Sequence, residues 1–224
     1  MKKGQYKRND KSMHIAEYFY TVKIVEPILP ILSKTFVTPN MVTIFNSFFS
    51  FLIFYLAYQK EFFIVAICIQ LYLFLDILDG NLARRKNMKT KLGARLDTIN
   101  DRVFYTLIFV FIGYKIVDAY MIALVIILIN LYAIVATFYI VPRLRKLNVI
   151  KRRGIKKFFM DRGFIIGMDL GTIDIMTSIL LIFKEIRLLY FLLIIGLILD
   201  IALRLVELKF NQGLKENQII ESKK

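Results

Sequence analysis

Apolar blocks of about 20 residues recur along the chain, and this feature limits what the chain can fold into. A helix of that length crosses the roughly 30 Å hydrocarbon core of a bilayer. Hydrophobic residues make up 58% of the 224 residues, whereas soluble proteins contain roughly 45–50% apolar residues. A segment in lipid must satisfy its backbone hydrogen bonds internally. The blocks therefore predict an all-α integral membrane protein that resides in the lipid bilayer.

We predict six transmembrane helices, preceded by an interfacial amphipathic helix over about residues 12–34. In that first segment apolar residues alternate with Glu17, Lys23 and Glu26, a mixture typical of a helix that lies in the membrane interface. Ser12 is a candidate N-cap there. The predicted spans cover about residues 39–58, 62–84, 96–117, 120–141, 163–183 and 188–208.

These segments divide the chain into three parts. Residues 1–38 form an N-terminal region with the amphipathic helix, residues 39–208 form one six-helix domain, and residues 209–224 form a polar tail. Thr38 and Pro39 indicate the start of the first span, because Thr is a favoured N-cap and Pro is favoured at the first helical position.

The net charge of +15 is concentrated in some of the connections between the blocks. Residues 84–95 hold six Lys and Arg without an acid, and residues 143–162 hold nine against Asp161 alone. Basic residues beside apolar spans are typical of topology determinants and of contacts with anionic lipid, so no nucleic-acid binding is expected. With six spans, every basic segment falls on one side, which the positive-inside rule makes cytoplasmic. We therefore predict a multi-pass protein of a cytoplasmic or plasma membrane, with both termini in the cytoplasm.

The chain has one cysteine, Cys68, and one histidine, His14. An intrachain disulfide, a cysteine metal site and a site built from several histidines are therefore excluded. Any metal binding or acid–base chemistry must use carboxylates.

Four carboxylates stand beside apolar segments, where charged groups are costly. Asp76 and Asp79 are three residues apart, and Asp97 and Asp101 are four apart. At helical spacing each pair lies on one side of its helix, and two antiparallel helices bring the pairs face to face. Oxygen ligands of this kind suit Mg²⁺ or Mn²⁺, and four of them can hold two ions for phosphoryl transfer.

The residues around the carboxylates indicate a diphosphate substrate. Arg84 is suited to binding a phosphate, and Gly80 and Ala83 are small enough to let a ligand approach. A membrane cation channel or transporter that uses the carboxylates as an ion site is the rival interpretation. Such a pathway would not need an arginine beside the cluster.

The complete spacing resembles the signature of the CDP-alcohol phosphotransferase family, whose members are membrane enzymes of phospholipid synthesis. The resemblance covers the whole chain, because that family also has six spans, an interfacial N-terminal helix and a Pro-Asn-x-x-Thr element, here Pro39 to Thr43. The matching motif reads Asp76-x2-Asp79-Gly80-x2-Ala83-Arg84-x8-Gly93-x3-Asp97-x3-Asp101.

The resemblance implies a role for each residue of the motif. Asp76, Asp79 and Asp97 look like ligands of one divalent cation, and Asp76, Asp97 and Asp101 look like ligands of a second. Asp101 is also similar to the general base that deprotonates the acceptor hydroxyl. The residues that resemble nucleotide contacts are Asn40, Thr43, Gly80, Arg84 and Thr90. Helix capping alone would explain Asn40 and its neighbours, and Thr90 as a plain loop residue stays an alternative.

The implied reaction is phosphatidyl transfer from a CDP-linked donor, such as CDP-diacylglycerol, to an alcohol acceptor with release of CMP. The reverse assignment, a small CDP-alcohol and a lipid hydroxyl, stays open. So does the identity of the acceptor. Dimerisation is common in the family, so a homodimer is one assembly open to the chain, although no residue pattern indicates it.

Further charged residues occur in the last two predicted spans. Asp169 and Asp174 either face the acceptor cavity or pair with a neighbouring helix. Asp200 and Arg204 are four residues apart and are expected to pair with each other. The basic segment 143–157 indicates lipid contact and topology, or else supplies a residue that binds a phosphorylated acceptor.

Overall fold

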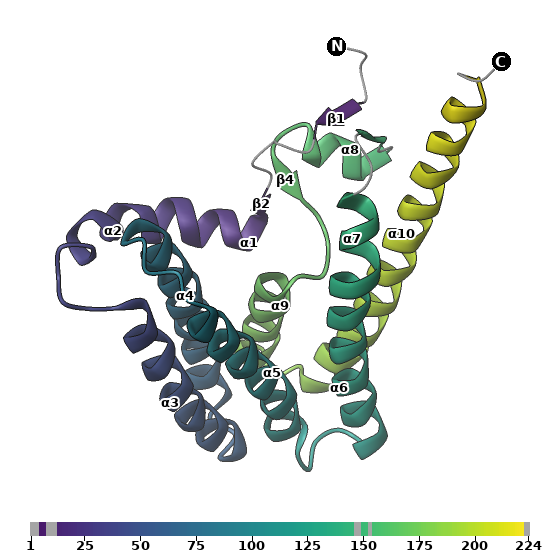
Figure 1. Cartoon of the computed structure of the whole chain (residues 1–224). Helices are drawn as coiled ribbons and strands as arrows, with labels where there is room; N and C mark the ends of the chain where they lie inside the picture. The colour runs from purple at the N-terminus through teal and green to yellow at the C-terminus, as the bar shows by residue number, and fades with distance from the viewer. Residues whose placement is uncertain (1–4, 8–12, 146–148, 152–153, 222–224) are drawn as a thin grey trace.

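The computed structural model describes residues 5–7, 13–145, 149–151 and 154–221, and this part of the chain is almost entirely helical (Figure 1). The predicted Ser12 cap lies outside the described residues. The helices are α1 Ile15–Tyr18, η1 Phe19–Val25, α2 Glu26–Leu32, α3 Pro39–Tyr58, α4 Phe62–Arg85, α5 Lys91–Gly113, α6 Ala119–Ile134, η2 Val135–Ile140, α7 Val141–Arg145, α8 Gly154–Met160, α9 Leu170–Ile182 and α10 Ile186–Glu221. The strands are β1 Gln5–Lys7, β2 Met13–His14, β3 Val149–Lys151 and β4 Phe164–Ile165.

The prediction of an all-α membrane protein is confirmed at the level of the fold. Among the described residues, four helical stretches have the length and composition to cross a membrane: Pro39–Tyr58, Phe62–Arg85, Ala119–Leu144 and Ile186–Gly213. The other two predicted spans correspond to α5, whose first half carries several charges, and α9. At 1.5 Å per residue the 13 residues of α9 extend about 20 Å. The count of six spans therefore stays a prediction.

Two predicted boundaries differ from the structure. The helix of the fifth predicted span, α9, begins at Leu170 and not near residue 163, because Gly163 adopts a positive φ of 85° and Asp169 caps the helix. Asp169 thus precedes α9, although we expected it within a span. The last helix continues to Glu221, through most of the predicted polar tail. No Pro or Gly ends α10 near residue 208, so the helix extends past its apolar part.

The helices pack around one main apolar core, with a second, smaller apolar cluster where η1, α3 and α4 meet. α4 packs against α3 and α9, α3 also contacts α5, and α6 packs against α10 (Figure 1). The ring of Tyr72 on α4 stacks on Phe104 of α5 at a centroid distance of 3.7 Å. Many large apolar side chains point outward, including Phe48 and Phe63, as expected for helices that face lipid.

The sequence signals at the start of α3 act as predicted. The Thr38 side chain accepts a hydrogen bond from the backbone N–H of Met41 at 3.3 Å, and Pro39 occupies the first helical position. The cap fixes where α3 begins, and this end of α3 lies beside the motif residues of α4 and α5.

The N-terminal helical segment α1–η1–α2 lies crosswise over the end of α4 (Figure 1). Its middle, Phe19–Val25, is a π-helix, and Pro30 lies inside α2. Just before it, β2 pairs in parallel with β4, with Met13 opposite Phe164 and His14 opposite Ile165. β1 pairs antiparallel with β3. These short pairings tie the N-terminal region to the connection between α7 and α9.

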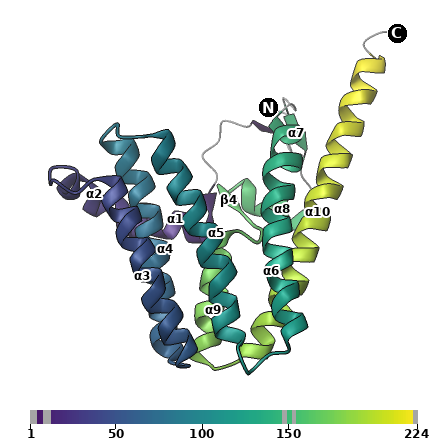
Figure 2. The same cartoon turned by 60° about the horizontal axis from the view of Figure 1, so that its bottom comes forward.

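The basic connections gather at one end of the molecule. Figure 2 shows the α4–α5 connection, β1, α7 and the C-terminal part of α10 toward one end, with the short connections after α3, α5 and α9 toward the other. This arrangement agrees with the alternation of basic and near-neutral segments in the sequence.

Candidate active site

Three of the four motif carboxylates converge where the C-terminal part of α4 meets the N-terminal half of α5. Ligand oxygens of Asp76, Asp97 and Asp101 all lie within 4.8 Å of one another. Helical periodicity explains this, because Asp97 and Asp101 are one turn apart and face Asp76 across the helix pair. Three carboxylates this close repel one another strongly unless a cation neutralises them.

The chemistry of this cluster fits a divalent cation. Mg²⁺ binds oxygen ligands at about 2.1 Å, so small side-chain adjustments bring the three carboxylates to one ion. The residues are also those that the family resemblance implies for the second ion. Asp76, Asp97 and Asp101 are therefore suited to hold Mg²⁺ or Mn²⁺.

Asp79 lies outside this group of three and is held by α3. The Thr43 hydroxyl lies 2.6 Å from Asp79 Oδ2 and 3.2 Å from the carbonyl oxygen of Pro39. The hydroxyl has one proton, and the shorter contact with the carboxylate is the stronger one. Thr43 and Asp79 are both buried, at 5% and 6% exposed. Thr43 therefore positions a carboxylate, a role that the sequence reading did not include.

A small pocket of about 210 Å³ opens on the Asp79 side of the cluster. All five predicted nucleotide contacts line it, together with two motif carboxylates. The lining residues include Asn40, Thr43, Asp79, Gly80, Arg84, Thr90 and Asp97. We call this cavity the small pocket. It brings together a guanidinium, hydroxyl and amide groups, and a glycine.

The glycines of the motif have different surroundings. A Cβ on Gly93 would lie 2.8 Å from Asn40 Oδ1 and 3.0 Å from Thr90 Oγ1, so a larger residue would require these side chains or the two helices to shift. A Cβ on Gly80 would meet only the guanidinium of Arg84, at 3.9 Å. Gly80 thus leaves space in the small pocket, and Gly93 permits a close helix contact.

Thr90 has a structural role in addition to its place in the small pocket. Its side chain accepts a hydrogen bond of 2.9 Å from the backbone N–H of Gly93 and so caps α5. The cap explains this residue type without a ligand.

Asp101 has polar neighbours that the sequence analysis missed. The Tyr72 hydroxyl lies 3.4 Å from Asp101 Oδ1, and Asn100 Nδ2 donates to that hydroxyl at 3.0 Å. Tyr72 lies one turn before Asp76 on α4, which places its hydroxyl beside α5. A tyrosine in an apolar helix usually indicates packing, so only the three-dimensional contact reveals this neighbour.

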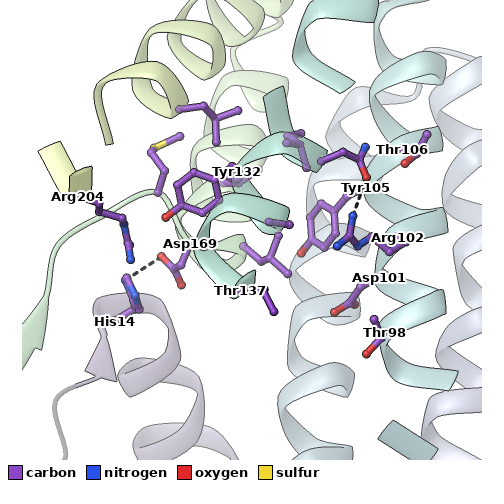
Figure 3. Close-up of a pocket in the computed structure, with 18 residues that line it drawn as sticks. His14, Thr98, Asp101, Arg102, Tyr105, Thr106, Tyr132, Thr137, Asp169 and Arg204 are labelled. Atoms are coloured by element: carbon purple, nitrogen blue, oxygen red, sulfur yellow. Dashed lines mark hydrogen bonds and ion pairs between the residues drawn. The ribbon is translucent and has the colours of Figure 1, made fainter. Parts of the chain in front are cut away.

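A larger pocket of about 390 Å³ opens on the Asp101 side of the cluster (Figure 3). Asp101, Arg102 and Tyr105 form one side of it, and Tyr132 on α6 lies across from them. The residues of α9, α10 and the N-terminal region that line it include His14, Asp169, Ile173 and Arg204. We call this cavity the large pocket.

The wall of the large pocket that lies away from Asp101 carries both signs of charge (Figure 3). His14 Nδ1 lies 3.2 Å from Asp169 Oδ1. Burial raises the pKa of the Asp169 carboxyl, but the contacts with His14 and Thr172 outweigh burial and hold that pKa below its usual value. Arg204 pairs with Asp200 at 2.7 Å, as predicted. Asp169 is therefore an ionised carboxylate at neutral pH.

Asp174 does not line the large pocket, although we considered that placement. It is 3% exposed and accepts a hydrogen bond of 2.7 Å from the Tyr105 hydroxyl. The alternative of pairing with a neighbouring helix is the one that the structure bears out. Of segment 143–157, the described Lys156 pairs with Glu207, and neither lines the large pocket.

Comparisons with known proteins identify the family. The family model for CDP-alcohol phosphatidyltransferases matches residues 36–202. An uncharacterized protein of Aquifex aeolicus (strain VF5) is 34% identical over 94 residues, which are 42% of this chain and 48% of that protein. The match thus spans about half the length of that relative.

Solved structures share the fold. The phosphatidylinositol phosphate synthase PgsA1 of Mycobacterium tuberculosis with CDP-DAG bound has a TM-score of 0.58 and 18% identity, over 83% of this chain and 94% of that one. The same protein in complex with manganese and citrate has a TM-score of 0.59 and 17% identity, over 83% and 88% of the two chains. The family model, the motif spacing and this fold agree, and the chain belongs to the CDP-alcohol phosphatidyltransferase family.

Proposed function

We propose that this chain transfers a phosphatidyl group from a CDP-linked lipid donor, such as CDP-diacylglycerol, to a small alcohol and releases CMP. The observation that carries the proposal is the position of the carboxylates between two pockets. Asp79 and Asp97 line the small pocket, and Asp101 lines the large one. Two substrates that bind on opposite sides of the cluster would meet at it.

The small pocket supports the nucleotide side of this proposal. Arg84 can donate paired hydrogen bonds to a diphosphate, and Gly80 leaves room beside it. Asn40 and Thr90 supply further polar groups, and PgsA1, which has the same fold, binds CDP-DAG. The cytidine diphosphate therefore belongs in the small pocket, and the acceptor belongs in the large pocket.

The reaction is a substitution at phosphorus. The acceptor oxygen forms a bond to the phosphatidyl phosphorus, and the bond from that phosphorus to the CMP oxygen breaks. Asp101 takes the hydroxyl proton as general base. Arg84 stabilises charge on the departing phosphate. Bound divalent cations supply electrostatic stabilisation of the negative charge on the phosphates, and Asp76, Asp79, Asp97 and Asp101 are the residues that would hold two of them.

Polar groups in the large pocket support the assignment of the lipid to the donor. Charged and hydroxyl side chains from α5, α6 and the start of α9 converge there, including Arg102, Tyr132 and Asp169. A small water-soluble alcohol suits such a site better than a diacylglycerol hydroxyl, whose acyl chains would need an apolar path.

The proposal is tested with the purified full chain in lipid nanodiscs. CDP-diacylglycerol with labelled acyl chains is supplied with Mn²⁺ or Mg²⁺ and a panel of alcohols, and CMP and the lipid products are measured by mass spectrometry. We expect metal-dependent CMP release with one labelled phospholipid product. Release of CMP only from small CDP-alcohols with diacylglycerol would establish the reverse assignment. Cation flux in vesicles without any CMP release would contradict an enzyme altogether.

We further propose that the site faces the cytoplasm, because the basic connections lie at its end of the molecule (Figure 2). Lys60 and Lys89 lie in connections at opposite ends. In a Cys68→Ala background, Lys60→Cys in intact cells should react with an impermeant thiol reagent, whereas Lys89→Cys should react only after permeabilisation. The opposite pattern would reverse the orientation.

A further inference from the structure

The charged residues that line the large pocket indicate which class of acceptor binds there, an inference that rests on the proposed function. An acceptor that presents its hydroxyl to Asp101 extends its other end toward His14, Asp169 and Arg204 (Figure 3). We call these three residues the distal wall. An acceptor that binds well must present groups of opposite charge to the charged residues of this wall, because an unpaired charge in a partly buried site is costly.

The negative group of the distal wall is Asp169, and only one of its oxygens is occupied by described residues. Oδ1 accepts from the backbone N–H and the hydroxyl of Thr172, at 3.3 and 2.5 Å, and it also contacts His14. Within the described part of the chain, Oδ2 has no hydrogen-bond donor. This carboxylate oxygen is therefore available to a cationic group.

The positive group of the distal wall is Arg204, whose guanidinium is held in place by Asp200. Its Nε donates to Asp200 Oδ2 at 2.7 Å, and the Tyr132 hydroxyl donates to the same oxygen at 2.6 Å. Among the described residues, the two terminal nitrogens of the guanidinium have no hydrogen-bond acceptor. They are available to an anionic group, and the ion pair with Asp200 sets the orientation of the guanidinium.

This combination disfavours two classes of acceptor. At the distal wall, a phosphate dianion would meet the ionised Asp169 and a guanidinium whose charge Asp200 already balances, so repulsion offsets attraction there. The other guanidinium of the pocket, Arg102, lies on the Asp101 side. A neutral polyol would offer Asp169 Oδ2 and the terminal nitrogens of Arg204 only neutral hydrogen-bond partners, which bind more weakly than charged ones. A molecule with one cationic and one anionic group satisfies both residues and adds no net charge.

We propose that the acceptor is a small zwitterionic amino alcohol, an α-amino acid with a hydroxyl group, of which serine is the simplest. Its ammonium group contacts Asp169, its carboxylate contacts Arg204 and its hydroxyl points to Asp101. The hydroxyl oxygen then forms the bond to the phosphatidyl phosphorus, the bond to CMP breaks, and the proton goes to Asp101. The product is a phospholipid with an amino-acid headgroup.

The first experiment compares acceptors on the full chain in nanodiscs with labelled CDP-diacylglycerol. Serine is compared with glycerol 3-phosphate, inositol and inositol phosphate by CMP release and by the mass of the lipid product. We expect kcat/KM for serine to exceed that of the others by at least about tenfold. A preference for a phosphorylated alcohol or a polyol would overturn the zwitterion proposal and leave the transfer reaction standing. No product with any acceptor would overturn both.

The second experiment assigns each charge to one residue by using two truncated acceptors. Ethanolamine has the ammonium group without the carboxylate, and glycerate has the carboxylate without the ammonium group. Asp169→Asn removes the charge but keeps the helix cap, because Asn is also a favoured N-cap. This variant should raise KM for serine and ethanolamine by at least about tenfold and leave KM for glycerate and the donor unchanged.

The complementary variant is Arg204→Gln, which should raise KM for serine and glycerate but not for ethanolamine. It leaves the carboxylate of Asp200 without its partner, so Arg204→Lys is made alongside to keep a positive charge near Asp200. Lysine cannot form the paired contact with a carboxylate, so the same pattern is expected in a folded protein. Equal effects of both substitutions on all three acceptors would overturn the assignment. Asp118→Asn, at an exposed residue at the opposite end of the molecule, serves as the control.

Discussion

The hydroxyl of Thr43 on α3 donates a 2.6 Å hydrogen bond to the carboxylate of Asp79 on α4, and both side chains are buried. The contact joins the Pro-Asn-x-x-Thr element of the first predicted span to the acidic motif of the second. The pair lies at the edge of the small pocket. The element therefore has a use beyond helix capping, because it holds one motif carboxylate in place.

Thr43→Val should weaken this junction, because it keeps the shape of the side chain and removes the donor to a buried carboxylate. A hydrogen bond to a charged group contributes about 1.5–3 kcal/mol. We expect lower thermal stability in detergent and a higher Mn²⁺ concentration for half-maximal CMP release. Thr43→Ser keeps the hydroxyl and serves as the matched control. A valine variant that behaves like the serine variant would show that the contact is unimportant.

The four motif carboxylates should differ in how many Mn²⁺ ions are lost when each one is replaced by asparagine. If Asp76 and Asp97 are shared by two ions, Asp79→Asn and Asp101→Asn should each leave one Mn²⁺ bound, and Asp76→Asn should leave none. Equilibrium dialysis with Mn²⁺ measures the stoichiometry, and a chelator should abolish CMP release from the unaltered protein. Two ions retained by Asp76→Asn would contradict a shared ligand.

Asp101→Asn should reduce turnover severely and keep much of the nucleotide binding. The amide cannot accept the hydroxyl proton, and loss of a general base lowers rates by about 10²- to 10⁴-fold. The side chain lines the large pocket and not the small one, so CDP-diacylglycerol should still bind, more weakly only to the extent that one ion is lost. Binding is measured by ligand-induced stabilisation in Mn²⁺. Near-normal turnover would remove Asp101 from the role of base.

Tyr72→Phe tests whether the neighbouring hydroxyl orients Asp101. Phenylalanine keeps the stacking on Phe104 and removes the group that contacts Asp101 and Asn100. If the lost hydrogen bond raises the activation free energy by about 1 kcal/mol, kcat falls roughly fivefold, with KM for the donor unchanged. A change confined to thermal stability would indicate a packing role alone.

The two motif glycines should respond differently to alanine. Gly93→Ala places a Cβ 2.8 Å from Asn40 Oδ1, so α5 and α3 must separate or Asn40 must move, and both stability and activity should fall. Gly80→Ala meets only the Arg84 guanidinium at 3.9 Å. That variant should fold normally and raise KM for the donor, because the methyl group occupies the small pocket. Thermal unfolding and donor kinetics of both variants distinguish the two roles.

Much of the architecture could be predicted because bilayer thickness and helix periodicity act on the sequence directly. The apolar blocks give the long helices, and the three- and four-residue spacing of the acids brings Asp76, Asp97 and Asp101 together. The five residues that resemble the nucleotide contacts of the family all line the small pocket, and their contact with a nucleotide stays a prediction. These features depend on residues close in sequence or on a motif with fixed spacing.

The remaining features depend on contacts between distant segments. Nothing in the local sequence brings His14 to Asp169, because that contact requires β2 to pair with β4. Likewise, Tyr72 reaches Asp101 only through the packing of α4 on α5. The fifth predicted span begins several residues before α9 does. Its composition is typical of a span from residue 163 onward, but the turn at Gly163 and the cap at Asp169 delay the start of the helix to Leu170.

The pairing of β2 with β4 has a structural consequence. Met13 and His14 lead directly into α1, the first turn of the helical segment that lies crosswise over the end of α4 (Figure 1). His14, which lines the large pocket, is thus the residue immediately before that segment. Only His14 separates Met13, the residue paired with Gly163 and Phe164, from the helical segment that crosses α4, so one short stretch of chain belongs both to the N-terminal segment and to the wall of the large pocket.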